Sequence, residues 1–146
     1  MKRFLRGALV IVTAVFLTGL AEGDAQAQDP RASVAQKAAR DWLALTDRGD
    51  AKGAWDASGA KFRNAMPISG WTAALKSVRE PLGSTTNRAI TSTRFEKKLV
   101  DTPLGEYAVT VFQTSFSKRT TNEETVLLEL EADGTWRVIG YTIAGG

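Results

Sequence analysis

The segment YAVTVFQTSF, from Tyr107 to Phe116, is the strongest β-strand signal in this chain of 146 residues. It is dense in β-branched and aromatic side chains, which fit the pleated, half-buried surface of a sheet. Further along, Val126, Leu128 and Leu130 alternate with mostly polar neighbours, which is the pattern of a strand with one buried face. The second half of the chain is therefore predicted to form a sheet.

Turn signals separate these strands from others. The pair Asp133-Gly134 predicts a tight hairpin, after which a last strand runs from Trp136 to Ile143. On the other side, Thr102–Gly105 (TPLG) is a turn signal, preceded by a threonine-rich, partly exposed strand over Ser84–Phe95. Four strands in succession, joined by short turns, predict an antiparallel sheet.

The first half of the chain has helical periodicity instead. Asp29-Pro30 is a typical helix start, with Asp29 as N-cap and proline at the first helical position. Gly49 is placed to end this helix. Its predicted apolar face consists of residues spaced by three or four, namely Val34, Ala38, Trp42 and Leu45.

Two shorter helices are expected next. Asp50 is placed to cap one of them, and Ser69 to cap the other, which must end by Pro81 because proline disfavours a helical conformation at Glu80. The apolar residues of the two helices are Ala51, Ala54 and Trp55, with Phe62 beyond, and then Trp71, Ala74, Leu75 and Val78.

Helices first and strands afterwards indicate an α+β fold. We expect three N-terminal helices packed on one face of a curved antiparallel sheet of about four strands. The four tryptophans, which are Trp42, Trp55, Trp71 and Trp136, all lie on these helical or strand patterns and are interpreted as core residues.

The N-terminus has the layout of a secretory signal. Lys2, Arg3 and Arg6 precede an apolar run over Gly7–Leu20, and small residues follow around Ala27. The run is shorter than the roughly 20 residues that a membrane-spanning helix needs. We therefore expect residues 1–27 to be a cleavable signal peptide, residues 28–146 to form a single domain without a membrane span, and the protein to be periplasmic or secreted.

The amino-acid composition restricts the possible export routes and binding partners. The chain has no cysteine, so it cannot carry the lipid of a bacterial lipoprotein. Its start has only Lys2-Arg3 where a twin-arginine signal needs paired arginines, which favours the general secretory route. Without residues 1–27 the net charge is only +2, and the basic residues are scattered. Nucleic-acid binding is therefore not expected.

Several short motifs together resemble a known family. They are Trp42-Leu43 with Asp47; Trp71; Arg79-x-Pro81-Leu82-Gly83 with Arg88; Gly105-Glu106-Tyr107; Phe112 and Phe116; Glu124-Thr125-Val126; and Gly134-x-Trp136-Arg137-x-x-Gly140-Tyr141. Over roughly Gln36 to Ile143 the chain resembles the bacterial exported family catalogued as domain of unknown function 4019. The resemblance implies no activity. The order of elements is also similar to the cystatin-like, cone-shaped fold of nuclear transport factor two and ketosteroid isomerase, which hosts both enzymes and binding modules.

The residue types present restrict the possible chemistry. Histidine and cysteine are both absent, which excludes the usual catalytic triads, thiolate chemistry, and histidine or cysteine metal sites. No cofactor and no metal are expected. Asp47 and Asp50 flank Gly49 and are interpreted as helix-terminus residues.

Glu124 is the carboxylate of most interest, because strand alternation places it on the face of Val126. A buried carboxylate needs a cationic partner or takes a raised pKa, and Arg79 and Arg88 are the candidate partners. The favoured interpretation is a structural ion pair that fixes how the third helix meets the sheet. One alternative is an acidic group at the floor of a pocket, and another, since Glu124 lies near the start of its strand, is a solvated side chain.

Three functions follow from these alternatives. The preferred one is a non-enzymatic exported module that binds a protein partner or a small ligand, with Arg79, Arg88, Tyr107 and Tyr141 as candidate binding residues. The second is a cone-fold enzyme that uses Glu124 as acid or base together with Tyr107 or Tyr141. The third is a structural envelope protein that self-associates through its sheet, for instance as a homodimer.

Overall fold

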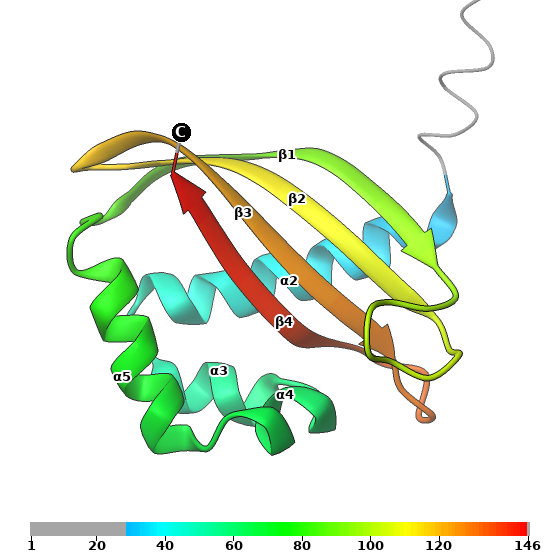
Figure 1. Cartoon of the computed structure of the whole chain (residues 1–146). Coiled ribbons are helices and arrows are strands. Elements are labelled where there is room, and N and C mark those ends of the chain that lie inside the picture. The colour runs from blue at the N-terminus through cyan, green and yellow to red at the C-terminus, as the bar shows by residue number, and fades with distance from the viewer. Residues whose placement is uncertain (1–28, 146) are drawn as a thin grey trace, which may run out of the picture.

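A computed structural model describes residues 29–145 of the chain (Figure 1). Within this range, four helices come first and four strands follow. The helices are α2 (Pro30–Asp47), α3 (Ala51–Ala57), α4 (Ala60–Ala65) and α5 (Ile68–Arg79). The strands are β1 (Thr85–Glu96), β2 (Tyr107–Phe116), β3 (Arg119–Leu130) and β4 (Trp136–Gly145). The predicted α+β class, with helices packed on a four-stranded antiparallel sheet, is confirmed.

The sheet is a simple meander. Each strand pairs antiparallel with the next in the order β1-β2-β3-β4, so β1 and β4 are its two edges. The sheet curves over α2, which contacts all four strands, while α3, α4 and α5 lie beneath it on the side of β4 (Figure 1). All the helices therefore pack on one face, which buries their apolar sides against the sheet.

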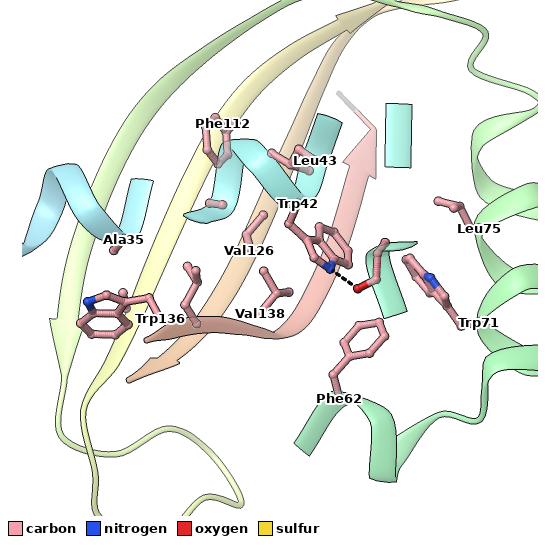
Figure 2. Close-up of a cluster of buried hydrophobic side chains, with 14 of the residues drawn as sticks. Ala35, Trp42, Leu43, Phe62, Trp71, Leu75, Phe112, Val126, Trp136 and Val138 are labelled. Carbon is pink, nitrogen blue, oxygen red and sulfur yellow. Dashed lines mark hydrogen bonds between the residues drawn. The ribbon is translucent and has the colours of Figure 1, made fainter. Parts of the chain in front are cut away.

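Aromatic side chains fill the space between the helices and the sheet (Figure 2). The rings of Trp42 and Trp71 lie 5.6 Å apart, and Phe62 packs edge-on against both at 5.9 and 5.1 Å. Each large apolar side chain buried in this way stabilises the fold by roughly 1.5–3 kcal/mol. The prediction that Trp42, Trp71 and Trp136 are core residues is confirmed, and Trp55 is partly buried against the same cluster.

Most predicted boundaries hold because local chemistry sets them. Asp29 caps α2 by accepting a hydrogen bond from the N–H of Arg31, and Asp50 caps α3 by accepting one from Gly53. Gly49 follows the end of α2 at φ +70°, and Gly134 takes φ +80° in the β3–β4 hairpin. Positive φ is a region that glycine enters without steric cost.

The buried face of α2 differs from the predicted one. Val34 is 56% exposed, whereas Ala35 and Ala39 are fully buried next to Trp42. Small side chains on this face allow α2 to approach the sheet closely, so the helix turns its alanines inward in place of the larger Val34.

Two other helical predictions need correction. The second helix is interrupted at Ser58, which is extended, and a separate helix α4 follows because the N–H of Gly59 hydrogen-bonds to the carbonyl of Val138 in β4 (2.7 Å). Helix α5 is preceded by Pro67, not by a cap at Ser69. It does end before Pro81 as predicted, although Glu80 keeps helical dihedral angles.

One further apolar position was misplaced. Val78 was assigned to the buried stripe of α5, but it is 46% exposed, while Trp71 and Leu75 of the same helix are buried. The side chain of Val78 instead lies at the rim of a surface trough described below.

Within residues 29–145, no helix combines the length and the apolar character needed to cross a bilayer. The predicted signal peptide, residues 1–27, lies outside the described residues.

Candidate functional site

Strand register brings the candidate residues together on the inner face of the sheet. Glu124 of β3 lies opposite Phe112 of β2 and Ile143 of β4. Arg88 of β1 lies opposite Thr114, two residues from Phe112 and therefore on the same face. Four adjacent strands thus direct polar side chains to one region near the C-terminal ends of α2 and α5.

Glu124 is fully buried, and hydrogen-bond donors surround its carboxylate. Arg88 Nε donates to Oε1 at 2.8 Å, and Thr114 Oγ1 donates to the same oxygen at 2.5 Å. The hydroxyl of Tyr141 donates to Oε2, and Arg79 Nη1 lies 3.8 Å from that oxygen. Both carboxylate oxygens are therefore satisfied from within the protein.

Asp47, the last residue of α2, joins the two arginines from the helix side. Arg88 donates to it twice, from Nη1 to Oδ2 at 2.7 Å and from Nη2 to Oδ1 at 2.9 Å. Arg79 Nη2 lies 2.5 Å from Oδ1, and Thr85 Oγ1 donates to the same oxygen at 2.9 Å. We refer to Asp47, Arg79, Arg88 and Glu124 as the ion network, in which two carboxylates and two guanidinium groups balance in charge.

Contacts in and beside the network shift the pKa values of Asp47, Arg88 and Tyr141. Burial alone would raise the pKa of Asp47, but hydrogen bonds from Arg88 and Arg79 outweigh this effect and hold that pKa at about 2. Burial would lower the pKa of Arg88, whereas its hydrogen bonds to Asp47 and Glu124 raise it above its ordinary value. Burial, reinforced by the neighbouring Glu124 carboxylate, raises the pKa of Tyr141 well above its usual range. At neutral pH the hydroxyl of Tyr141 is therefore a neutral donor.

The comparison with known families identifies the chain. The family model described as "Protein of unknown function (DUF4019)" matches residues 38–141.

The chain belongs to this family.

The matched span of DUF4019 contains all four residues of the ion network and ends at Tyr141. The resemblance predicted from the sequence motifs is confirmed, although the family itself carries no assigned activity. No curated protein and no solved structure matched the chain.

Sequence reasoning located part of this DUF4019 site. The predicted contact of Glu124 with Arg79 and Arg88 is present, and Tyr141 joins it. Tyr107 does not join this group. It lies five residues from Phe112 on the same strand, and alternation therefore places it on the opposite face. Its hydroxyl donates to the carbonyl of Pro103 at 2.9 Å. The structure therefore separates Tyr107 from the carboxylate with which it was paired as a candidate.

Asp47 is the member of the network that the sequence analysis missed. It was interpreted as a helix-terminus residue, and it does end α2, but its carboxylate also bridges Arg79 and Arg88. A signal was available in the charge balance. Two arginines directed towards one buried carboxylate require a second anion, and Asp47 is the acidic residue that ends the helix packed on that face.

A pocket of about 450 Å³ lies between the end of α2 and α5 in the described part of this DUF4019 domain. Asp47 and Arg79 lie in its wall, with Lys76 and Glu80 also lining it, but Glu124 does not line it. A molecule in this pocket would meet a charge-balanced surface and would not touch the buried carboxylate. Among residues 29–145, no three acidic side chains come together in a way that could hold a metal ion.

Proposed function

We propose that this DUF4019 chain is an exported, non-enzymatic binding or interaction module, in which the ion network is a structural joint between the helices and the sheet. The observation that carries the proposal is the complete burial of Glu124 under donors supplied by the protein itself. A general acid or base must come within hydrogen-bond reach of the substrate proton that it transfers. Glu124 has neither the exposure nor a free oxygen for this role.

The composition of the chain supports the same proposal. Without histidine or cysteine, proton transfer and nucleophilic catalysis would have to rely on carboxylates, lysines, tyrosines or hydroxyl groups. The most strongly perturbed of these in the described residues, Tyr141, is held as a neutral donor to Glu124. Perturbed groups also occur in structural ion networks, and the charge balance of this network favours that explanation.

The joint has a clear mechanical role. Asp47 belongs to α2, Arg79 to α5, Arg88 to β1 and Glu124 to β3. Their ion pairs tie two helix ends to an edge strand and an inner strand. A partner-binding module needs such fixed geometry, because a surface that is already in its bound conformation loses less entropy on binding.

Export is the second part of the proposal, and it rests on residues 1–27. The positive start, the apolar run and the small residues near Ala27 have the order of a signal peptide. Expression of the whole chain in a Gram-negative host, followed by fractionation and intact-mass measurement, tests this part. We expect periplasmic protein that begins at Gln28, whereas uncut protein in the cytosol would refute it.

Replacement of Glu124 by Gln tests the structural role. Loss of the buried charge leaves two arginines against Asp47 alone, and breaking a buried pair in this way costs about 3–5 kcal/mol. Glu123→Gln, on the adjacent exposed residue of β3, is the matched control and should change the unfolding free energy by less than about 0.5 kcal/mol. Catalytic residues are often held at a cost in stability, so a Glu124→Gln protein as stable as wild type, or more stable, would favour the enzyme.

A further inference from the structure

The two edges of the sheet differ in how they are protected. Edge strands expose unpaired backbone groups, and proteins usually protect them with bulges, charges or proline. In β1 the register shifts twice, and the strand carries Arg88, Arg94 and Glu96. In β4 the seven residues from Ile139 to Gly145 (IGYTIAG) include no charged residue and no proline.

The unprotected part of β4 is also regular. From Gly140 to Gly145 it pairs with β3 residue for residue. The single register shift between the two strands, at Leu127/Leu128, comes just before this segment of β4. Apart from its pairing with β3, the only backbone hydrogen bond of β4 in the described chain is from Gly59 N–H to the carbonyl of Val138, before this segment begins. Residues 140–145 thus present a regular, uncharged edge of roughly 20 Å.

An apolar trough follows this edge on the helix side. Helix α5 stands beside β4 (Figure 1), and two hollows of about 150 and 250 Å³ lie between them. The hollows share Val78 and Ile143 as lining residues and so adjoin each other, and we call them together the β4 trough. Met66 and Val78 are exposed at the trough, at 36% and 46%, although both are large apolar side chains.

A buried polar atom without a partner marks one end of the trough. Asn122 lines the trough, and its side chain is buried, with 1% of the residue exposed. Its Nδ2 donates to the carbonyls of Thr114 and Arg119. Its Oδ1 has no hydrogen-bond partner among the described residues. A buried acceptor left unpaired destabilises the fold, because it has lost its hydrogen bond to water.

The charge of the trough selects among possible ligands. Arg119 is its only charged lining residue, and its guanidinium lies against Gly145 at the end of β4. A carboxylate is the natural partner of a guanidinium group. An acidic group at one end of an otherwise uncharged ligand would therefore match this surface.

We infer that the β4 trough binds an extended peptide segment of another protein, which adds to the sheet as a fifth strand beside β4. Backbone hydrogen bonds to residues 140–145 supply affinity, and the inward side chains of the segment enter the trough, as in other cases of strand addition. The segment carries small or β-branched apolar residues at alternate positions and an acidic group at the end that meets Arg119. This inference rests on the proposed function and names the class of partner.

A peptide selection tests the inference without knowledge of the natural partner. The probe is a phage-displayed library of random peptides of roughly ten residues, long enough to span a strand, selected on the purified protein. We expect enriched peptides that alternate apolar and polar residues, lack a central proline and end in an acidic residue. Hydrogen exchange of residues 140–145 should slow when the best peptide binds.

Variants with a matched control locate the site. Val78→Glu places a negative charge at the rim of the trough and should weaken peptide binding by about tenfold or more. Val34→Glu makes the same substitution at another exposed helical valine, away from the trough, and should change binding by less than about twofold. Arg119→Glu should shift the selected peptides from an acidic end to a basic one.

Several outcomes would overturn the inference. Selection that enriches no sequence is one, and equal binding by wild type and Val78→Glu is another. Protection that appears in the loop over residues 97–106, or around the pocket between α2 and α5, would place the site elsewhere. Protection of β4 in a dimer of the free protein would show that a second copy occupies the edge. None of these results would affect the proposed function, which fails separately if the chain stays uncut in the cytosol or has a turnover that Glu124→Gln abolishes.

Discussion

Acid should weaken the fold through Asp47 by an amount that follows from its contacts. The hydrogen bonds from Arg88 and Arg79 hold the pKa of this carboxyl at about 2, against 3.8 in the absence of such contacts. One pKa unit corresponds to about 1.4 kcal/mol, and the side chain is only 24% exposed. The charged form of Asp47 therefore contributes about 2 kcal/mol to the free energy of unfolding.

The sign of the effect follows from the depressed pKa. The contribution is fully present above the unfolded-state pKa near 3.8 and is lost as the pH falls towards 2. Asp47→Asn cannot titrate, so the stability difference between wild type and this variant should shrink by about 2 kcal/mol from pH 5 to pH 2. Other carboxylates titrate in both proteins, and their effects cancel in the difference.

Urea unfolding followed by tryptophan fluorescence at several pH values measures this difference. Asp56→Asn is the control, because Asp56 pairs with Lys52 on an exposed helix face. Its effect should stay below about 0.5 kcal/mol throughout. A difference between wild type and Asp47→Asn that does not change with pH would refute the assignment of Asp47 to the network.

Two further predictions concern the packing and the turns. Trp42→Phe removes the indole N–H, which donates to the carbonyl of Ala54 at 3.0 Å and to Ser58 Oγ at 2.9 Å. The substitution should therefore lower the unfolding free energy by about 2 kcal/mol. An unchanged urea midpoint would contradict this prediction. Gly134→Ala forces an L side chain into φ +80° and should cost about 1 kcal/mol. Gly70→Ala, in α5 with no atom nearer than 3.7 Å to the new Cβ, should instead stabilise by about 0.5–1 kcal/mol, and the same sign of effect for both glycines would disprove the reasoning.

Features set by local chemistry could be predicted from the sequence. The caps at Asp29 and Asp50 and the turn at Gly134 depend on residues within a few positions of each other. The alternation around Glu124 was enough to place it on the buried face and to pair it with arginine. These inferences needed no knowledge of how the elements pack.

Features set by tertiary contacts could not be predicted in this way. The break between α3 and α4 depends on a hydrogen bond from Gly59 to β4, which is distant in sequence. The choice of Ala35 over Val34 for the buried face depends on how closely α2 approaches the sheet. Charge balance pointed to a second acidic residue near the two arginines, but the bridging contacts of Asp47 also require that α2 and α5 end at the same place, which the packed structure shows.

The double-mutant cycle between Arg88 and Glu124 tests most directly whether the buried network is a structural joint. Arg88→Met and Glu124→Leu should each cost about 3–5 kcal/mol, because each removes one charge of the buried network and leaves the remaining charges unbalanced. Together they leave Asp47 paired with Arg79, so the double variant should lose about 2–3 kcal/mol less than the sum of the two single losses. Additive losses, or a Glu124→Leu protein more stable than wild type, would contradict the account.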